Sequence, residues 1–323
     1  MERMKTSVER RLGCRLAILS MLLAVVPPAF SATMVSWKRA PGLLACEFDG
    51  KSLWEFSWAT NQGKPFFHPI RLAGGESLTA LKPSDHTWHY GLWFSWKYIN
   101  KVNYWEEDKK TNKAEGPTRW DEPQVVTHDD GSVEIKMNLR YLSPTNGAVV
   151  LSEEREILVS APRPDGGVTI DWSGTFMAGD LPLVLDRTPM PGEEHGAVNG
   201  GYAGFSMRAA QAPAEVQFVT LEGPVERFET NRARPNSKAA ACNVTQGGRT
   251  DGVAILSHVS NTGGDSPWYM INSEAMRWFS PALLAPAPKK VAPHETFTWR
   301  FRVCTQAGAW TPAGLREATA AYK

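Results

Sequence analysis

The sequence predicts an all-β protein, a large antiparallel β-sandwich with few helices. Short segments along the chain alternate apolar and polar residues at period two, the pattern of a strand with one buried face. Asp-Gly, Asn-Gly and proline-rich joints, which favour turns, fall between them. Because no helical period separates the segments, we expect the strands to pair as antiparallel sheets around a common core.

The expected elements follow one another along the chain. The strands cover residues 34–39, 43–50, 51–58, 132–142, 157–162, 167–176, 215–223, 252–261 and 296–305. In the fourth of these, Val133, Ile135 and Met137 share one face, while Glu134 and Lys136 lie on a wet face. The sequence "PALLAPAPKKVAP" is expected to be a loop, and only the tail "PAGLREATAAYK" is typical of a helix.

The amino terminus has the composition of a secretory signal. Basic residues precede an apolar run from Leu16 to Val26, and a small-residue exit leads to Ser31. The run is too short for a membrane span, which needs about 20 apolar residues. We therefore expect a signal peptide over residues 1–31, a single β-sandwich domain over residues 32–323 without a membrane span, and a periplasmic or secreted location.

Charge and cysteine content limit the possible binding partners and the number of disulfide bonds. Lys plus Arg number 35 and Asp plus Glu 34, so no strong field of one sign recruits nucleic acid or anionic lipid. A carbohydrate or another small ligand fits better. After signal removal Cys46, Cys242 and Cys304 remain, which allows at most one disulfide and leaves open whether one forms. The oligomeric state is not predicted.

The segment "PSDHTWHYGLWFSW" carries the most chemistry. It sets Asp85, His86 and His89 among large aromatic residues, as a metal site, an acid/base pair or a polar cap would. On a strand the two histidines would point to opposite faces, but the turn signal at Pro83 allows a loop to bring them together. Because no complete set of metal ligands accompanies them in sequence, no metal and no cofactor is expected.

The acid/base interpretation needs an imidazole and a carboxylate that reach one ligand. Glu106 and Glu107 follow soon after in "NKVNYWEED", and a return connection would bring Glu107 near His86. The structural alternative is a solvated charged turn at 106–110. The 13 tryptophans also allow two interpretations, aromatic walls of an open groove or plugs at the sandwich edges.

The segment 66–107, "FFHPIRLAGGESLTALKPSDHTWHYGLWFSWKYINKVNYWEE", resembles the opening signature of the bacterial PmoA-like family, also named methane oxygenase PmoA. In that family an "HP" element precedes "D-H-x-x-H-x-G-L-W-F" and "N-x-x-x-F/Y-W". The later segments "EEREILV", "GGYAGFSMR", "GVAILSHVSN" and "SPWYM" are similar to further elements of it. The sequence departs from the family at Val259, where proline is common, and at Met270-Ile271, where an arginine is usual.

The resemblance implies an exported β-rich protein, similar in outline to galactose mutarotase-like supersandwiches, of a kind found in polysaccharide-degrading bacteria. Besides Asp85, it marks the following candidate residues: catalytic His86, His89, Glu107 and His258, and substrate-binding His68, Asn103, Trp105, Arg155, Tyr202, Arg208 and Trp268.

Three functions follow as hypotheses. The first is a carbohydrate-active enzyme, an isomerase such as an epimerase, a lyase or a hydrolase, with His86 or His89 as acid, Glu107 as base, and Arg155 or Arg208 clamping a hydroxyl or carboxylate. Hydrolysis is not the favoured reaction, because two carboxylates usually flank a glycosidic bond and the marked region offers only Glu106, Glu107 and Asp108. The second is a non-catalytic carbohydrate-binding protein. The third is the metal-dependent oxygenase that the family name suggests.

Overall fold

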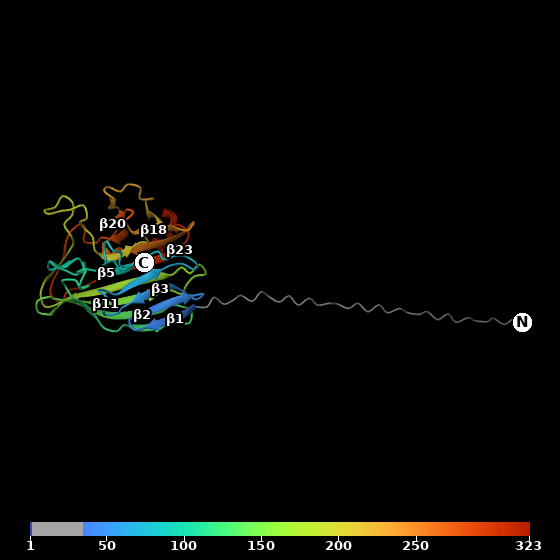
Figure 1. Cartoon of the computed structure of the whole chain (residues 1–323), viewed down its shortest axis with the longest axis horizontal. Helices are drawn as coiled ribbons and strands as arrows, with labels where there is room; N and C mark the ends of the chain where they lie inside the picture. Colours follow the sequence, from blue (N-terminus) through green and yellow to red (C-terminus); the bar gives the residue numbers. More distant parts are fainter. Residues whose placement is uncertain (2–34) are drawn as a thin grey trace. The chain divides into compact units, whose positions relative to one another are not determined.

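The alternating segments form the strands of two large antiparallel sheets (Figure 1). The structure is a computed structural model that describes Met1 and residues 35–323. The predicted signal segment, Met1 apart, lies outside these residues, so the signal and the domain division stay predictions.

The first sheet has ten strands and carries the site described below. In spatial order it comprises β1 (Val35–Ala40), β2 (Leu43–Phe48), β3 (Lys51–Ser57), β4 (Phe66–Ile70), β5 (Leu92–Ser95), β14 (Gly204–Arg208), β21 (Arg277–Pro281), β20 (Ser266–Asn272) and β16 (Arg232–Ala233), and β17 (Asn236–Ser237) pairs with β20. The chain therefore leaves this sheet after β5 and returns to its other half much later.

The second sheet has nine strands and is mostly built from long ones. Its order is β15 (Glu215–Thr220), β18 (Ala239–Gln246), β19 (Arg249–Ser257), β23 (Thr296–Ala307), β12 (Thr169–Ala178), β11 (Val149–Val159), β10 (Val133–Leu142) and β8 (Thr118–Trp120), and β9 (Gln124–Thr127) pairs with β10. A small third sheet consists of β22 (Lys289–Val291), β13 (Leu183–Asp186), β6 (Tyr98–Ile99) and β7 (Val102–Asn103).

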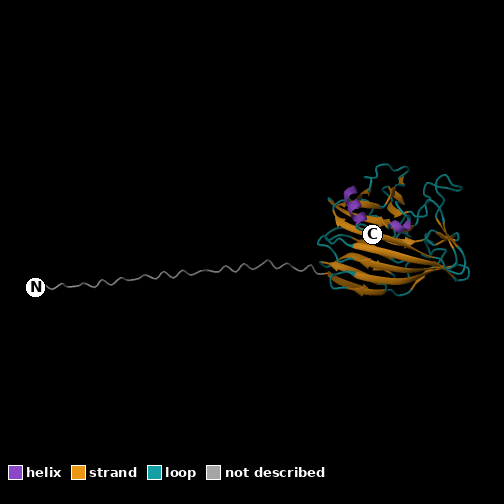
Figure 2. Cartoon of the chain, turned by 180° about the vertical axis from the view of Figure 1, so that it is seen from behind, coloured by secondary structure: helices purple, strands orange, loops and turns teal. Residues whose placement is uncertain are grey.

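Helices are few in the described residues. A 3₁₀ turn, η1, spans Val259–Asn261 and the helix α1 spans Pro312–Ala320 (Figure 2). Thr311 caps α1, because its hydroxyl accepts a hydrogen bond from the Gly314 amide at 3.1 Å. The predictions of an all-β sandwich and of a helical tail are confirmed.

The two large sheets share one apolar core. Along β10 the residues alternate between buried and exposed, as period two requires, so that Val133, Ile135 and Met137 face inward. Phe94 of the ten-stranded sheet stacks on Trp172 of the nine-stranded sheet with ring centroids 4.9 Å apart. These contacts join the sheets into a sandwich.

The ten-stranded sheet is also covered on its outer face, around β5, β20 and β21. Phe94 belongs to the sandwich core, whereas its neighbour Trp93 joins a second apolar cluster. Trp278 and Tyr269 belong to this second cluster, which loops cover from outside. The excess of tryptophan therefore serves both a core and an outer aromatic layer.

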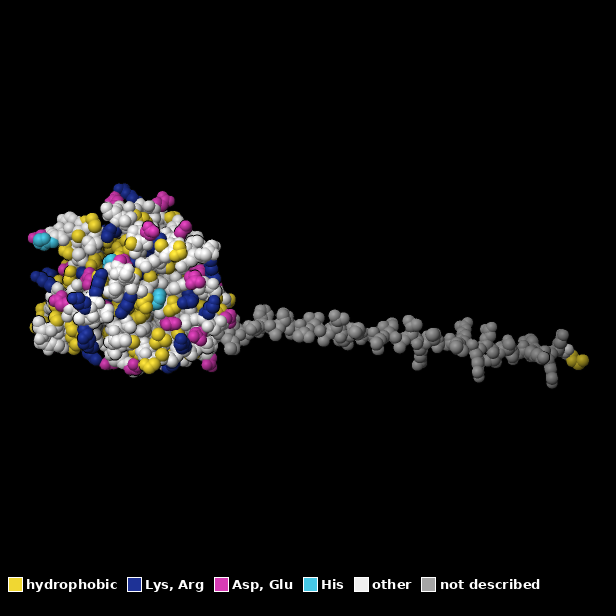
Figure 3. Space-filling view, in the orientation of Figure 1, with side chains coloured by type: hydrophobic (Ala, Val, Ile, Leu, Met, Phe, Trp, Pro, Cys, Tyr) yellow, Lys and Arg dark blue, Asp and Glu magenta, His cyan; other side chains and the backbone are white. Residues whose placement is uncertain are grey.

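The structure also bears on the predicted loop, the cysteines, the charge distribution and the membrane span. The expected loop at 281–293 contains the short strand β22, which pairs with β13, so that part of the prediction is wrong. Cys46, Cys242 and Cys304 are free thiols. Acidic and basic side chains mix over the face seen in Figure 3. No helix in the described range has both the length and the apolar character needed to cross a membrane.

Candidate functional site

The two histidines of "DHTWH" lie on a loop of tight turns between β4 and β5. The His86 amide donates to the Pro83 carbonyl at 2.9 Å, and the His89 amide donates to the His86 carbonyl at 3.0 Å. Gly91 ends the loop with φ +72°, and a Cβ there would lie 2.5 Å from the Phe67 carbonyl oxygen. The prediction that a loop carries the histidines is confirmed.

Arg208 anchors this loop from the next strand of the sheet. It closes β14 with a fully buried side chain. Its Nη2 donates to both carboxylate oxygens of Asp85, at 3.1 and 2.9 Å, and to the Ala275 carbonyl at 2.8 Å. Partial burial raises the pKa of Asp85, but the hydrogen bonds from Arg208 and His86 outweigh it and hold the pKa below its ordinary value.

The same guanidinium fixes the proton of His89. Nη1 of Arg208 lies 3.3 Å from Nδ1 of His89. Because arginine only donates, this contact makes Nδ1 the acceptor and leaves the imidazole proton on Nε2. Burial first, and then the charges of His86 and Arg208, lower the pKa of His89 well below its ordinary value. His89 is therefore neutral at physiological pH, with Nε2–H as a donor.

His86 has the opposite tautomer. Its Nδ1 donates to Oδ2 of Asp85 at 2.9 Å, because the ionised carboxylate only accepts. In the neutral form of the ring the lone pair is therefore on Nε2. The His86 and His89 rings stack with centroids 4.7 Å apart and planes inclined by 27°. One ring thus offers an acceptor and the other a donor, both set by Asp85 and Arg208.

Both histidines line a cavity of about 420 Å³ on the outer face of the ten-stranded sheet. Its wall is made mainly of aromatic rings and contains one carboxylate. The full lining is His86, Trp88, His89, Trp105, Glu106, Asn199, Tyr202, Arg232, Tyr269, Ile271, Met276 and Trp278.

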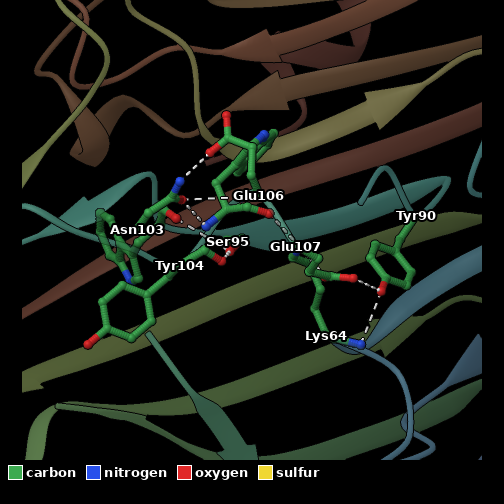
Figure 4. A network of polar contacts seen from close by, with 10 residues as sticks. Lys64, Tyr90, Ser95, Asn103, Tyr104, Glu106 and Glu107 are labelled. Carbon is green, nitrogen blue, oxygen red and sulfur yellow. Dashed lines mark hydrogen bonds and ion pairs between the residues drawn. The ribbon is translucent and has the colours of Figure 1, made fainter. Parts of the chain in front are cut away.

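Glu106 is the carboxylate of this cavity, and Asn103 at the end of β7 positions it (Figure 4). The Asn103 side-chain oxygen accepts from the amides of Trp105 and Glu106 at 2.8 and 3.2 Å, while its Nδ2 donates to Oε2 of Glu106 at 2.6 Å. Lys97 donates to the same oxygen, and the Tyr202 hydroxyl donates to Oε1 at 2.7 Å.

These partners keep Glu106 ionised. Burial would raise the pKa of the carboxyl, but the Lys97 ammonium and the hydrogen bonds from Tyr202 and Asn103 together hold it below its ordinary value. Tyr202 is held in its phenol form, because burial and the nearby Glu106 charge raise its pKa. The cavity therefore presents a carboxylate beside a neutral hydroxyl.

Glu107, the predicted base, points away from this cavity and lies in a buried ion pair (Figure 4). Its Oε1 accepts from Nζ of Lys64 at 2.7 Å, and its Oε2 accepts from the Tyr90 hydroxyl at 2.5 Å. The side chains of Glu107 and Lys64 are 2% and 4% exposed. The structure thus gives the cavity position to Glu106 and corrects the location expected for Glu107.

Two predicted histidines also lie elsewhere. His258 caps η1, where its Nδ1 accepts from the Ser260 amide at 3.1 Å. His68 lies on β4, and its Nδ1 is 2.8 Å from the Thr79 hydroxyl. Neither lines the cavity, so the expectation that His258 shares a pocket with His86 is not met.

Arg155 and Trp268 belong to the interior of the sandwich. Arg155 on β11 donates to Glu153 at 2.5 Å and lies 5.3 Å from the Trp172 ring centroid. Trp268 is 1% exposed and donates from Nε1 to the Ser237 carbonyl at 2.9 Å. Both are core residues, outside the cavity lining.

Sequence reasoning missed most residues of the far wall of the cavity. The predicted Trp268 and the observed Tyr269 are neighbours on β20, and only Tyr269 faces outward. A period-two reading of β20 and β21 would have found the wall. The missed lining residues are Trp88, Asn199, Arg232, Tyr269, Ile271, Met276 and Trp278.

The residues present do not fit a transition-metal oxygenase. Nδ1 of His89 accepts from Arg208, which leaves the proton on Nε2, the nitrogen that faces the cavity side, and the rings of His86 and His89 stack rather than converge on one point. The Arg208 cation beside His89 opposes a second positive charge there. Within the part of the chain that is described, no three His, Cys, Asp or Glu side chains gather as a metal set.

Comparison with known proteins adds a family and distant structural likenesses. A model described as a family of unknown function, DUF6807, matches residues 44–320. No curated protein matches the chain significantly.

Among solved structures, a Klebsiella pneumoniae protein with the provisional name aldose 1-epimerase is 8% identical with a TM-score of 0.49, over 87% of this chain and 83% of its own. An alpha-galactosidase from Lactobacillus brevis is 10% identical with a TM-score of 0.44, over 86% of this chain. The alignment spans 40% of the galactosidase. At these scores the likenesses carry no argument about ligand or activity.

Proposed function

This chain belongs to the DUF6807 family, whose function is unknown, and we propose from the geometry of its cavity that it is a carbohydrate-active enzyme. The reaction is a proton transfer on a sugar by histidine and carboxylate groups, in the class of isomerases such as epimerases, or lyases. We also propose that the chain is exported, which would place it where polysaccharide fragments occur.

The observation that carries the proposal is the complementary pair of imidazoles. His86 offers an unprotonated Nε2 and His89 offers Nε2–H, and both residues line one cavity. Opening a cyclic sugar needs one group that takes the proton of the anomeric hydroxyl and one that gives a proton to the ring oxygen. The stacked pair of opposite tautomers supplies a base for the first proton, His86, and a hydrogen-bond donor for the ring oxygen, His89; the protonated His86 can then give the proton back.

The proton of this step is exchanged between the substrate and His86. His86 takes a proton on Nε2 and becomes an imidazolium, which the Asp85 carboxylate stabilises through Nδ1–H at 2.9 Å. The ring bond between C1 and oxygen breaks as the C1=O bond forms, and its electron pair moves to the ring oxygen. There Nε2–H of His89 donates a hydrogen bond, and the His86 imidazolium returns the proton it took. Arg208 holds both Asp85 and His89 without entering the cavity lining, so it is a positioning residue.

The rest of the wall suits a saccharide. Trp88, which is partly exposed, offers an apolar ring face on which the C–H face of a sugar ring can pack, and the largely buried Trp105 and Trp278 complete the apolar lining. Glu106 and the Tyr202 hydroxyl stand beside them as hydrogen-bonding groups for ring hydroxyls. Aromatic burial also excludes water, which strengthens each of these hydrogen bonds.

A second candidate is a non-catalytic saccharide-binding protein. It is favoured by the state of Glu106, whose carboxylate already accepts hydrogen bonds from Lys97, Asn103 and Tyr202. A carboxylate so well satisfied is a weak base and a good positioning group. This second function needs the same cavity and differs only in the absence of turnover.

The test is saccharide turnover and binding measured together. The purified protein is incubated in D₂O with a panel of reducing sugars and oligosaccharides. NMR then follows anomer exchange, deuterium uptake at carbon and new unsaturated products, while tryptophan fluorescence reports binding.

His86→Gln and His89→Gln should each lower turnover about 10²–10⁴-fold, and the matched control His258→Gln should leave it unchanged. Binding without turnover in the wild-type protein would support the second candidate. Absence of binding to every saccharide would overturn both.

A further inference from the structure

We infer that the saccharide carries an anionic group, a carboxylate or a sulfate, which Arg232 and Arg234 bind where the cavity meets a neighbouring hollow of the surface. The inference rests on the proposed function and narrows its substrate class to acidic sugars.

Arg232 connects two hollows of the surface. It lines the 420 Å³ cavity and also an adjoining hollow of about 600 Å³, so a ligand longer than one ring would pass its guanidinium. Its Nε donates to the Tyr269 hydroxyl at 2.9 Å and its Nη1 to the Thr230 carbonyl at 2.6 Å. These two bonds fix the guanidinium plane and leave Nη2 without a hydrogen bond to any described residue.

Arg234 lies over the ring of the same tyrosine. Its guanidinium carbon is 4.2 Å from the centroid of the Tyr269 ring, and its Nη2 donates to the Val198 carbonyl at 2.7 Å. Its Nη1 is shielded from solvent and has no hydrogen-bond partner in the described chain. Arg234 also lines the larger hollow. Both guanidinium groups thus contact Tyr269, and each has one nitrogen without a hydrogen-bond partner among the described residues.

Neither arginine has a carboxylate partner among the described residues. This sets them apart from the fully buried arginines, because Arg155 pairs with Glu153 and Arg208 pairs with Asp85. In the larger hollow Glu229 is already engaged by the exposed Arg227.

Two positive charges without counter-charges at an aromatic wall favour an anion over a neutral hydroxyl. Arginine also presents parallel N–H donors that match the oxygens of a carboxylate or a sulfate. Glu222, which also lines the hollow, stands as the one acidic side chain there besides Glu229, so the positive charges outnumber the negative ones.

The test compares matched acidic and neutral probes. Trigalacturonate and trimannuronate are compared with their methyl esters, and a sulfated carrageenan disaccharide with its desulfated form. Binding is measured by tryptophan fluorescence and calorimetry at about 50 mM NaCl, where the Debye length exceeds about 10 Å. Preference for the uronates identifies a carboxylate subsite, and preference for the carrageenan disaccharide identifies a sulfate subsite.

The acidic member of at least one pair should bind about tenfold or more tightly than its neutral partner. Arg232→Gln combined with Arg234→Gln should abolish that difference while leaving the affinity for the neutral partner within about threefold. Arg227→Gln is the matched control, an arginine of the same hollow that already has an acid partner, and it should keep the preference. If neutral saccharides bind as well as acidic ones, this inference alone is overturned. If no saccharide binds at all, the proposed function is overturned as well.

Discussion

The adjacent residues Glu106 and Glu107 allow a matched test of how the site is built. Each is bonded to one lysine and one tyrosine, Glu106 to Lys97 and Tyr202, and Glu107 to Lys64 and Tyr90. One carboxylate lines the cavity, and the other is buried beneath it. Replacing each in turn by glutamine removes one charge with little change in shape.

The expected costs differ because the burial differs. In Glu107→Gln the Lys64 ammonium, 4% exposed, loses its counter-charge, and removing one partner of a buried pair costs about 3–5 kcal/mol. That is a large part of the total stability of a domain, about 5–15 kcal/mol. In Glu106→Gln the Lys97 ammonium, 5% exposed, also loses its counter-charge, but the Glu106 side chain is 27% exposed and water in the cavity can replace part of the lost interaction. This substitution should therefore cost less, about 1–3 kcal/mol.

The two substitutions should rank in the opposite order in their effects on function: Glu106→Gln should impair it and Glu107→Gln should not. The main consequence of Glu107→Gln concerns the charge of Lys64. Burial already lowers the pKa of Lys64, while Glu107 raises it. Without Glu107 the lysine should lose its proton more readily, and raising the pH should recover part of the stability. The variant Glu107→Gln, assayed at a temperature well below its melting temperature, should bind and turn over saccharide like the wild type.

Glu106→Gln should lose about 10²-fold in turnover, or an equivalent share of binding. Urea denaturation, fluorescence titration and NMR turnover on the same preparations measure all of these quantities. An inactive but stable Glu107→Gln, together with an active Glu106→Gln, would refute the assignment.

The remaining predictions concern the acid range, the thiols and the amino terminus. Burial first, and then Arg71, lowers the pKa of His68 to about 4, so the unfolded chain binds a proton that the folded chain does not between pH 6.5 and about 4. Stability should therefore fall as the pH drops through that window, by up to about 3 kcal/mol from this group, and urea titrations of His68→Gln should show a shallower fall. Reductant should leave the melting temperature unchanged, because Cys46, Cys242 and Cys304 are free; a drop of several degrees would contradict this. Sequencing of exported protein should begin near residue 32, and material that starts at Met1 would speak against export.

The long strands were predictable because each buries one face only. In β10 and β12 the solvent side is polar, so period two stands out along about ten residues. β5 and β14 are different, since sandwich core covers one face and the aromatic layer or buried polar groups cover the other. A short strand buried on both faces has no alternation to read. These two strands, whose preceding loops carry His86, His89 and Tyr202, were therefore the hardest to assign.

The loop histidines were predictable from residue type and a turn signal, but their division of labour was not. That division depends on Arg208, which is 119 residues away from His89 in the chain and one strand away in the sheet. The choice between Glu106 and Glu107 depends on a single step of backbone direction after β7, because consecutive side chains leave the chain on opposite sides.

The same step separates Trp268 from Tyr269, one in the sandwich core and the other at the cavity wall. A residue pattern can identify the segment that contributes to the site, but the strand register determines which of its side chains faces a ligand. For β20 that register is set by its pairing with β21, where Tyr269 lies opposite Ser280 and Ile271 lies opposite Trp278. On the outward face that results, Tyr269 contacts both Arg232 and Arg234, and this arrangement, rather than the sequence motif, is the basis for the proposed binding of an acidic sugar.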